Sequence, residues 1–435
     1  MDEATFFGLA AAVAEEDPVC EACTGRLLAD RSFGVTNRDR GRALRLAAAL
    51  LDDDPYEPPD PATCWVCEGQ THEIEPWANR VADALTGIEF STYQIGTRVP
   101  PLLAENDRLL RDVVGMDEDA GEPINRELNR EVGKQVGAIM NKGVNFERPD
   151  VVALLHLERN EVEISINPAF VYGRYQKLER DIPQTEWPCT DCGSSGKQLG
   201  ANGTEPCDGC HGTGYRYDKS VEGLTVPHVV SAMDGTEGIF HGAGREDVDA
   251  RMIGTGRPFV IEVKDPKRRD PELHEIREHI NTEADGAVEV GDLEFGTYEM
   301  VERVKELSAS KKYRVSVKFA APVTDRSLQN ALAALDGTTV EQYTPQRVDH
   351  RRASLTRERT VYSIDGELVS ATEGIVELHG EGGLYVKELI SGDDGRTTPS
   401  LAGLLDVEAT VESLDVLAVE GEDEPFITDE YIRTE

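Results

Sequence analysis

Eight cysteines, grouped in four Cys-x-x-Cys pairs, constrain the fold of this chain more than any other feature of its sequence. Two cysteines separated by two residues can turn around one metal ion, and two such pairs supply the four ligands of a tetrahedral Zn²⁺ site. Residues 24–63 separate the first two pairs and residues 193–206 the last two, so we expect two separate sites. The expected ligands are Cys20, Cys23, Cys64 and Cys67 in the first site, and Cys189, Cys192, Cys207 and Cys210 in the second.

Both sites are predicted to be structural, because neither has an obvious further chemical group beside its cysteines. Disulfides are the alternative, and a reducing cytosol disfavours them. Glycines follow both pairs of the second site, and such small residues let backbone N–H groups approach the thiolates. The string CDGCHGTG resembles half of the zinc module of DnaJ-type chaperones, whereas CTDCGSSG has displaced glycines. His211 could replace a ligand, although we expect it to face solvent.

Length and hydropathy predict a cytosolic protein of two or three domains. A chain of 435 residues exceeds the size at which one hydrophobic core keeps growing. The most apolar N-terminal stretch, FFGLAAAVA, is far shorter than the roughly 20 residues that span a bilayer. It follows Asp2 and Glu3 rather than a basic region, and acidic residues stand where a signal peptide would be cleaved.

The charge of the chain indicates a halophilic protein. Acidic residues number 83 and basic residues 45, for a net charge of −38 that is spread along the whole chain. Their mutual repulsion is costly in dilute salt, but at molar ionic strength the screening length falls to about 3 Å. The alternatives are an acidic mesophilic protein and a protein that meets a basic partner.

Periodicity predicts an α/β region followed by an α+β domain. Residues 38–52 favour a helix near the first zinc site, and the acidic, proline-rich residues 52–61 favour a connection. From about Glu75 to Lys177, VVALLHL and VEISINPAFVYG favour strands and RELNREVGKQVGAIM an amphipathic helix. Beyond Tyr215 the longer strand-like segments are typical of an α+β domain with an antiparallel or mixed sheet.

A glycine-rich turn within residues 238–263 is the best local candidate for a reactive site. In GIFHGAGREDVDARMIGTGRPFVIEV the turn precedes a strand in which Phe259, Ile261 and Val263 would share one face. A turn held by a strand is a sensible place for a reactive carboxylate. Taken alone, however, acidic residues of such a turn are usually caps or solvated charges.

The same string, with KKYRVSVKF, TPQRVDHRRA and GGLYVKELISGDDGRTTPS, closely resembles the archaeal tRNA pseudouridine synthases that modify uridines 54 and 55 of the T-arm. NRELNREVGKQVG, NPAFVYGRYQKLERDIPQTEWPC and the paired zinc knuckles also resemble that family, in order. The resemblance implies a pseudouridine-synthase fold, which is a twisted mixed sheet with a central cleft, and an RNA-binding region of the THUMP type. The expected domains are a zinc region (1–69), a THUMP-like domain (70–165), a linker with the second zinc knuckles (166–215) and the catalytic domain (216–435).

The resemblance implies that Asp247 is the catalytic carboxylate, because Gly244 to Asp247 match the Gly-Arg-x-Asp element of pseudouridine synthases. Asp249 is the rival. Arg245 is implied either to pair with the aspartate or to contact the phosphate of the flipped nucleotide. The reaction implied is isomerisation of an extruded uridine without a catalytic cofactor, by attack on C1′, by attack on C6 or through a glycal.

Two further segments are implied to contribute to this site. In KKYRVSVKF, alternation makes Tyr313 the first core residue of a strand, and the resemblance makes it the tyrosine that stacks on the uracil and moves the C5 proton. In GGLYVKELI, alternation predicts a strand with Tyr385 and Lys387 on one face. Lys387 is either a solvated lysine or the basic partner of Asp247.

The implied partner is tRNA, and one basic segment favours RNA binding. Thr344 to Arg359 carry Arg347, Arg351, Arg352, Arg357 and Arg359 against only two acidic residues. An exposed charged turn is the plainer interpretation. In concentrated salt counterion release contributes little, so binding would depend on shape, hydrogen bonds and stacking of the extruded base.

Two other functions remain open. A zinc-containing RNA-binding or chaperone-like module without catalysis fits the knuckles and the THUMP-like segment. A THUMP-containing methyltransferase or thiouridine synthase would need a glycine-rich nucleotide loop before a helix, and GTGRPF leads into a strand instead.

Overall fold

The chain folds into two units in a computed structural model that describes residues 3–200, 203–307, 309–349, 353–420 and 427–433. The first unit comprises Met1–Asn167 and the short segment Lys267–Arg269, and the second comprises Pro168–Pro266 and Asp270–Glu435. None of the helices in the described part of the chain is both long and apolar enough to cross a bilayer.

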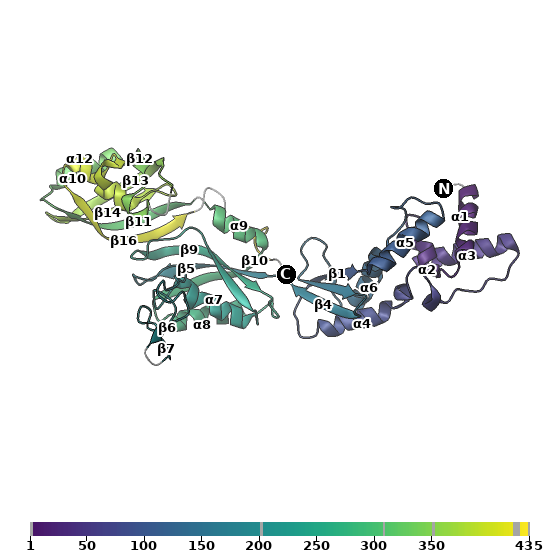
Figure 1. Cartoon of the computed structure of the whole chain (residues 1–435). Helices are drawn as coiled ribbons and strands as arrows, with labels where there is room; N and C mark the ends of the chain where they lie inside the picture. The colour runs from purple at the N-terminus through teal and green to yellow at the C-terminus, as the bar shows by residue number, and fades with distance from the viewer. Residues whose placement is uncertain (1–2, 201–202, 308, 350–352, 421–426, 434–435) are drawn as a thin grey trace. The chain divides into compact units, whose positions relative to one another are not determined.

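The first unit contains a four-stranded sheet in the order β2-β1-β3-β4 (Figure 1). Strand β1 pairs in parallel with β2 and β3, and β3 pairs antiparallel with β4. The strands are β1 (Thr92–Arg98), β2 (Gly143–Val144), β3 (Val151–His156) and β4 (Glu161–Ile166). The helices are α1 (Glu3–Glu15), α2 (Glu21–Arg26), α3 (Asn37–Asp52), η1 (Pro61–Thr63), η2 (Gln70–His72), α4 (Ile74–Ala84), α5 (Pro101–Val113) and α6 (Ile124–Met140).

One hydrophobic core runs through this unit. In α6, Leu128, Val132 and Val136 recur every fourth residue and are fully buried, as the amphipathic pattern predicted. The Tyr93 hydroxyl donates a 2.6 Å hydrogen bond to the Gly133 carbonyl and joins the sheet to this helix. The core also includes the first four cysteines. The expected zinc region and THUMP-like domain therefore pack around a shared core rather than around two.

The second unit contains a ten-stranded sheet in the order β10-β5-β9-β16-β11-β14-β13-β12-β15, with β8 also paired to β9. Among the described pairs, β9 and β16 are parallel and the others are antiparallel, so the predicted mixed-sheet α+β fold is confirmed. The strands are β5 (Ala169–Lys177), β8 (Glu237–Gly242), β9 (Arg251–Lys264), β10 (Val288–Gly296), β11 (Ser310–Phe319), β12 (Thr339–Tyr343), β13 (Thr356–Ser370), β14 (Glu373–Gly380), β15 (Thr397–Thr398) and β16 (Ala409–Glu420).

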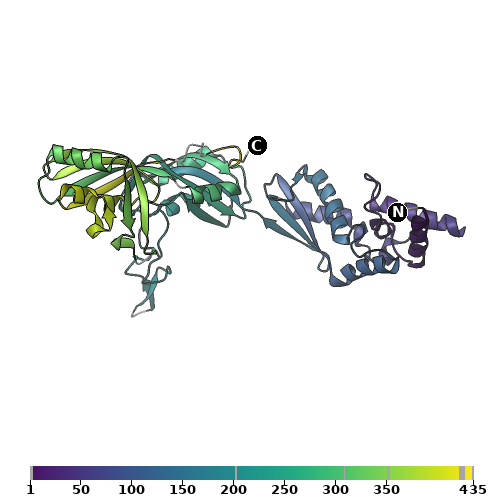
Figure 2. The ribbon, with the colours of Figure 1, turned by 90° about the horizontal axis from the view of Figure 1, so that it is seen from above.

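Helices cover this sheet, and one hairpin stands out from it. The helices are α7 (Val221–Ala232), α8 (Leu273–Glu283), α9 (Tyr298–Glu306), α10 (Asp325–Leu335), η3 (Gln346–Val348), α11 (Val386–Ser391), η4 (Asp393–Gly395) and α12 (Leu401–Leu405). Strands β6 (Lys197–Gly200) and β7 (Gly203–Pro206) form a separate hairpin between the last two cysteine pairs. Figure 2 shows this hairpin projecting from the body of the second unit.

Alternation along the central strands decides which side chains enter the core. Phe259, Ile261 and Val263 of β9 join the main core of the second unit, as predicted, while Val260 faces a smaller cluster. One expectation needs correction. Residues 166–215 were expected to be a linker, but residues 169–177 form β5, which lies between β10 and β9. Its run AFVYGRY is almost continuously buried, because a strand within the sheet is covered on both faces.

Candidate active site

The loop between β8 and β9, residues 243–250, presents Asp247 and Asp249 to a large cavity in the second unit. Gly244 begins the loop with a φ of +67°, a conformation that glycine adopts without strain. The Ala250 amide donates to the Asp247 carbonyl at 3.0 Å and closes a tight turn. The side chains of Asp247 and Asp249 are 39% and 61% exposed, so both carboxylates are accessible.

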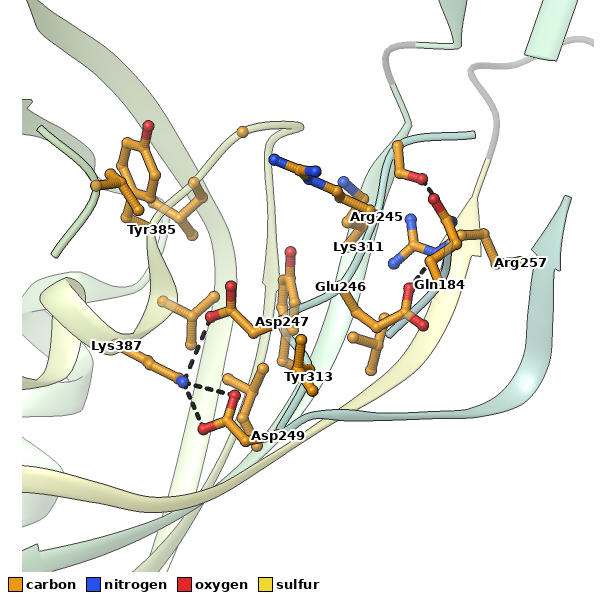
Figure 3. Close-up of a pocket in the computed structure, with 18 of the residues that line it drawn as sticks. Gln184, Arg245, Glu246, Asp247, Asp249, Arg257, Lys311, Tyr313, Tyr385 and Lys387 are labelled. Atoms are coloured by element: carbon orange, nitrogen blue, oxygen red, sulfur yellow. Dashed lines mark hydrogen bonds and ion pairs between the residues drawn. The ribbon is translucent and has the colours of Figure 1, made fainter. Parts of the chain in front are cut away.

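Two cations hold these carboxylates. Arg347 Nη1 lies 3.1 Å from Asp247 Oδ2, and Lys387 Nζ lies 3.4 Å from the same oxygen. Lys387 is closer to Asp249, with Nζ–O distances of 2.8 and 3.0 Å. Figure 3 shows Asp247 and Asp249 converging on Lys387. Burial alone would raise the pKa of the Asp249 carboxyl, but hydrogen bonding and charge from Lys387 outweigh it and lower that pKa.

The segment that carries Lys387 is a helix, which corrects the expected strand. Val386, Leu389 and Ile390 are buried at helical spacing in α11, and Lys387 occupies its first turn. The side-chain amide of Gln342 donates to the Tyr385 carbonyl at 2.9 Å and accepts from the Tyr385 amide at 2.8 Å. These hydrogen bonds fix the backbone of Tyr385, the residue before α11. Their partner, Gln342, lies in strand β12, which is distant in the sequence. Tyr385 lines the cavity, as does Leu384.

Tyr313 reaches the cavity from β11. The predicted alternation of this strand is confirmed, because Tyr313, Val315, Val317 and Phe319 are all buried on one face. The Tyr313 side chain is both a core residue and part of the cavity wall. Burial raises the pKa of its phenol to about 12. The phenol is therefore harder to ionise than that of an exposed tyrosine.

The arginines of the predicted basic segment have different positions. Arg347 was expected to bind RNA, but its guanidinium pairs with Asp247 and, at 2.7 Å, with Glu388. Arg357 and Arg359 line the cavity. Arg351 and Arg352 lie outside the described residues. Arg245, expected as a partner of Asp247, lines the cavity but forms no ion pair in the described part of the chain.

A buried ionic network behind the loop was not predicted from the sequence. The Glu246 side chain is fully buried and lies 2.9 Å from Arg257 Nε, which is also buried. It accepts a 2.9 Å hydrogen bond from the Tyr175 hydroxyl, whose pKa burial raises well above its usual range. Figure 3 shows Glu246 directed toward Arg257 and away from Asp249 and Lys387.

A buried lysine completes this network and contacts the loop that carries Asp247. Lys177 Nζ donates to the carbonyls of Asp247 and Val248 at 3.2 and 3.0 Å, and it lies 3.8 Å from Glu246. The sequence contained one signal for this group: Lys177 shares one face of β5 with Ala169, Val171 and Tyr175, a face that is otherwise apolar. This position in the sequence did not indicate that Glu246 would be the acidic residue near the Lys177 ammonium.

Lys311 is a further cation of the cavity that the sequence did not single out. It lies two residues before Tyr313, on the same side of β11, and lines the same cavity. Burial and the neighbouring Arg257 lower the pKa of its ammonium group to about 8. Figure 3 places Lys311 beside Arg245.

Two groups of four cysteines could each hold a metal ion. In a tetrahedral zinc site with Zn–S bonds of about 2.3 Å, the sulfur atoms lie about 3.8 Å apart. The Sγ–Sγ distances are 3.8 Å for Cys20–Cys67 and Cys23–Cys64 in the first group. In the second they are 4.0 Å for Cys189–Cys207 and 3.7 Å for Cys192–Cys210. These spacings and the free thiols fit zinc better than disulfides, whose sulfur atoms are about 2.05 Å apart.

Hydrogen bonds reach the sulfur atoms of both groups. The Cys20 amide donates to Cys64 Sγ at 3.2 Å, and the Gly214 amide to Cys210 Sγ at 3.2 Å. The contact from Gly214 agrees with the expectation that backbone N–H groups of these glycines approach the cysteine sulfur atoms. His211 is exposed and is not part of either group. A zinc ion bound to either group of four cysteines would cross-link segments that are distant in the sequence.

Comparison with known proteins places most of the chain in one family. The model of the domain described as "Pus10, C-terminal" matches residues 170–420, and that of "Pus10 THUMP domain, archaeal" matches residues 77–156. A protein of Halorubrum lacusprofundi described as "tRNA pseudouridine synthase Pus10" is 59% identical over 416 residues, which are 96% of each chain. One of the same description from Methanothrix thermoacetophila is 42% identical over 429 residues, or 93% of this chain and 92% of that one.

Similarity to solved structures is weaker. A chain of a "Cbf5-Nop10-Gar1 Complex" has 15% identity and a TM-score of 0.29 over 46% of this chain and 45% of that one.

Proposed function

Because the chain belongs to the archaeal Pus10 family of tRNA pseudouridine synthases, we propose that it isomerises uridine to pseudouridine at position 54, position 55 or both in the T-arm of tRNA, with Asp247 as the catalytic carboxylate. The observation that carries this proposal is the position of Asp247, which is accessible in the cavity, held by Arg347 and Lys387, and close to the buried phenol of Tyr313. The reaction would take place in the cytosol, on a uridine turned out of the RNA stack.

Charge explains why Asp247 suits this role better than Asp249. Two cations contact Asp247 without enclosing it, so its carboxylate can meet the ribose or the base. Asp249 engages the Lys387 ammonium with both oxygens and is better suited to position that lysine.

The reaction rearranges one nucleotide and leaves its composition unchanged. The bond between N1 and C1′ breaks, the uracil turns within the cavity, and C5 bonds to C1′; the C5 proton is lost and N1 gains one. Attack of Asp247 on C1′, attack on C6 and glycal formation all begin with an ionised carboxylate at this place. The Tyr313 ring would stack on the uracil, and its protonated phenol would donate a hydrogen bond to it.

The two groups of cysteines would hold structural zinc, and the first unit would grip the tRNA away from the cavity. The THUMP match lies in this unit, and its core contains the first cysteine group. Arg245, Arg357 and Arg359 line the cavity and would contact RNA there. Arg351 and Arg352 would extend the basic segment.

Asparagine at position 247 tests the catalytic assignment. Unmodified tRNA would be incubated in molar KCl with the wild type, Asp247→Asn or Asp249→Asn, and pseudouridine mapped by carbodiimide-blocked primer extension across the T-arm. We expect the wild type to form pseudouridine at 54, 55 or both. Asp247→Asn should form none while its Kd for tRNA stays within threefold, and Asp249→Asn should keep measurable activity.

Two outcomes would contradict the proposal. A wild type that binds tRNA without forming pseudouridine would support the non-catalytic RNA-binding module instead. Activity retained by Asp247→Asn and lost by Asp249→Asn would move the catalytic role to Asp249.

A further inference from the structure

The segment Pro183–Pro188 connects the loop that carries Asp247, residues 243–250, to the second cysteine group. At one end, Gln184 Nε2 donates to the Gly244 carbonyl at 2.9 Å and to the Tyr175 hydroxyl at 2.8 Å. At the other end, the Cys189 amide donates to the Gly214 carbonyl at 2.9 Å, at the root of the hairpin. A side chain between these anchors is held relative to both.

Trp187 is that side chain, and its ring belongs to a small aromatic and cationic cluster. The Tyr217 ring meets it edge to face, with centroids 5.6 Å apart. The Arg216 guanidinium carbon lies 5.8 Å from the centroid of each of the two rings, within the range of cation–π attraction. The Arg216 amide also donates to the Trp187 carbonyl at 2.8 Å. The backbone and the neighbouring side chains therefore both restrict the indole.

The Trp187 ring is half-buried and lines the cavity that contains Asp247 and Tyr313. No hydrogen bond of the indole N–H occurs within the described residues. Tyr215, on the same hairpin root, is 37% exposed and lines only a smaller neighbouring cavity. Of these two rings, only Trp187 lines the cavity that contains Asp247, although both line the smaller one.

The size of the cavity leaves room for more than the target base. Its volume is about 940 Å³, near the upper end of the roughly 300–1,000 Å³ typical of sites for small molecules. A uracil on Tyr313 occupies only part of that volume. Aromatic side chains next to a cation are the usual means by which proteins bind unpaired bases, since every base has a π face and an adjacent phosphate.

We propose that Trp187 and Arg216 form a second base-binding position, in which the indole stacks on the nucleotide next to the target uridine and the guanidinium faces its phosphate. This inference rests on the proposed function, because it takes RNA as the ligand of the cavity. It also gives the second cysteine group a role in the reaction, since that group anchors the root from which Trp187 reaches the cavity.

The test combines changes in the protein with removal of single bases from the RNA. Trp187→Ala, Trp187→Phe and the control Tyr215→Ala would be compared with the wild type in molar KCl. The substrates are intact tRNA and tRNAs with an abasic nucleotide immediately 5′ or 3′ of the target. Initial rates of pseudouridine formation would supply KM and kcat, filter binding Kd, and metal analysis the zinc content of each variant.

With intact tRNA, Trp187→Ala should raise KM and Kd by about 5- to 150-fold, which corresponds to the ~1–3 kcal/mol of one stacked base. Its kcat should change less than threefold. Trp187→Phe should keep most of the affinity, and Tyr215→Ala should match the wild type. With one of the two abasic tRNAs, the wild type should lose the same affinity, and Trp187→Ala should lose nothing further.

Two results would overturn the inference. One is a Trp187→Ala penalty of equal size on intact and on both abasic tRNAs, which would make Trp187 a structural brace of the hairpin. The other is a wild type whose Kd and KM are the same for intact tRNA and for both abasic tRNAs. This result would be decisive even if Trp187→Ala loses zinc or fails to fold. A wild type that forms no pseudouridine would contradict the proposed function instead. In that case the Kd values for intact and abasic tRNAs would still test whether Trp187 stacks on a base.

Discussion

Glu246 and Asp247 are neighbours in the chain whose side chains lie in opposite surroundings. Asp247 is accessible in the cavity, whereas Glu246 is fully buried against Arg257. Because the two residues share a peptide bond, the position of one limits that of the other. Lys177 adds to this restraint, since its ammonium holds the Asp247 carbonyl from the buried side. The loop that carries Asp247 is thus held in part by the buried charges of Glu246, Arg257 and Lys177.

Glu246→Gln tests this positioning. Removing one partner of a buried pair leaves an uncompensated charge, so we expect the free energy of unfolding to fall by about 3–5 kcal/mol. A displaced loop should lower kcat by about 100-fold. Urea unfolding and the rate of pseudouridine formation at saturating tRNA would measure the two effects.

The matched control is Glu262→Gln. Glu262 pairs with His241 at 2.9 Å near the same loop but is 22% exposed, so its loss should leave kcat within threefold. An unchanged kcat in Glu246→Gln would show that the buried network does not position Asp247.

At the scale of elements, one arginine joins the first cysteine group to the helices of the first unit. Arg26, at the end of α2, is 1% exposed, and its Nη2 donates to Cys23 Sγ at 3.1 Å. The same guanidinium pairs with Asp107 of α5 and, at 3.3 Å, with Glu127 of α6. Three helices therefore meet at one cation beside the cysteines. If zinc were bound there, this cation would offset part of the negative charge of four thiolate ligands.

Arg26→Met should therefore destabilise the first unit. We expect a loss of about 3–5 kcal/mol, because Asp107 and Glu127 would stay buried without their partner. Zinc retention should fall as well. Urea unfolding can be followed by tryptophan fluorescence, since Trp65 and Trp77 lie in this unit, with zinc per chain measured after dialysis against a chelator.

Arg108→Met is the corresponding exposed change. The Arg108 side chain is 59% exposed and pairs at 3.7 Å with Glu118, which is 71% exposed, and such a surface pair contributes only about 0–1 kcal/mol. Equal losses of unfolding free energy and of zinc in the two variants would mean that Arg26 stabilises the first unit no more than an exposed arginine does.

At the scale of the whole molecule, the net charge of −38 predicts that the protein needs salt to be stable and active. When KCl falls from about 1 M to about 0.1 M, the screening length grows from about 3 to about 10 Å, and the like charges repel over longer distances. We expect Tm and activity to fall together on dilution and to recover when KCl is restored.

Sucrose separates this effect from general stabilisation by solutes. It does not screen charge, so it should restore little of the Tm lost in dilute salt. A Tm that is unchanged between dilute and molar KCl would contradict an adaptation to salt.

The sequence by itself determined the features that depend on short spacing. The Cys-x-x-Cys pairs, the strand that carries Tyr313, helix α6 and the glycine-rich loop around Asp247 are each encoded within a few to about 20 neighbouring residues. Over such lengths, periodicity and turn chemistry decide which side chains face inward.

Only the tertiary structure decided which charges meet. Arg347 and Asp247 are separated by 100 residues, and Lys387 and Asp249 by 138. Three other features likewise depend on the order of the strands: the place of β5 in the sheet, the hydrogen bonds of Gln342 to the residue before α11, and the burial of Glu246 against Arg257. That order follows from burial summed over the whole chain, to which no single segment contributes enough to be recognised alone.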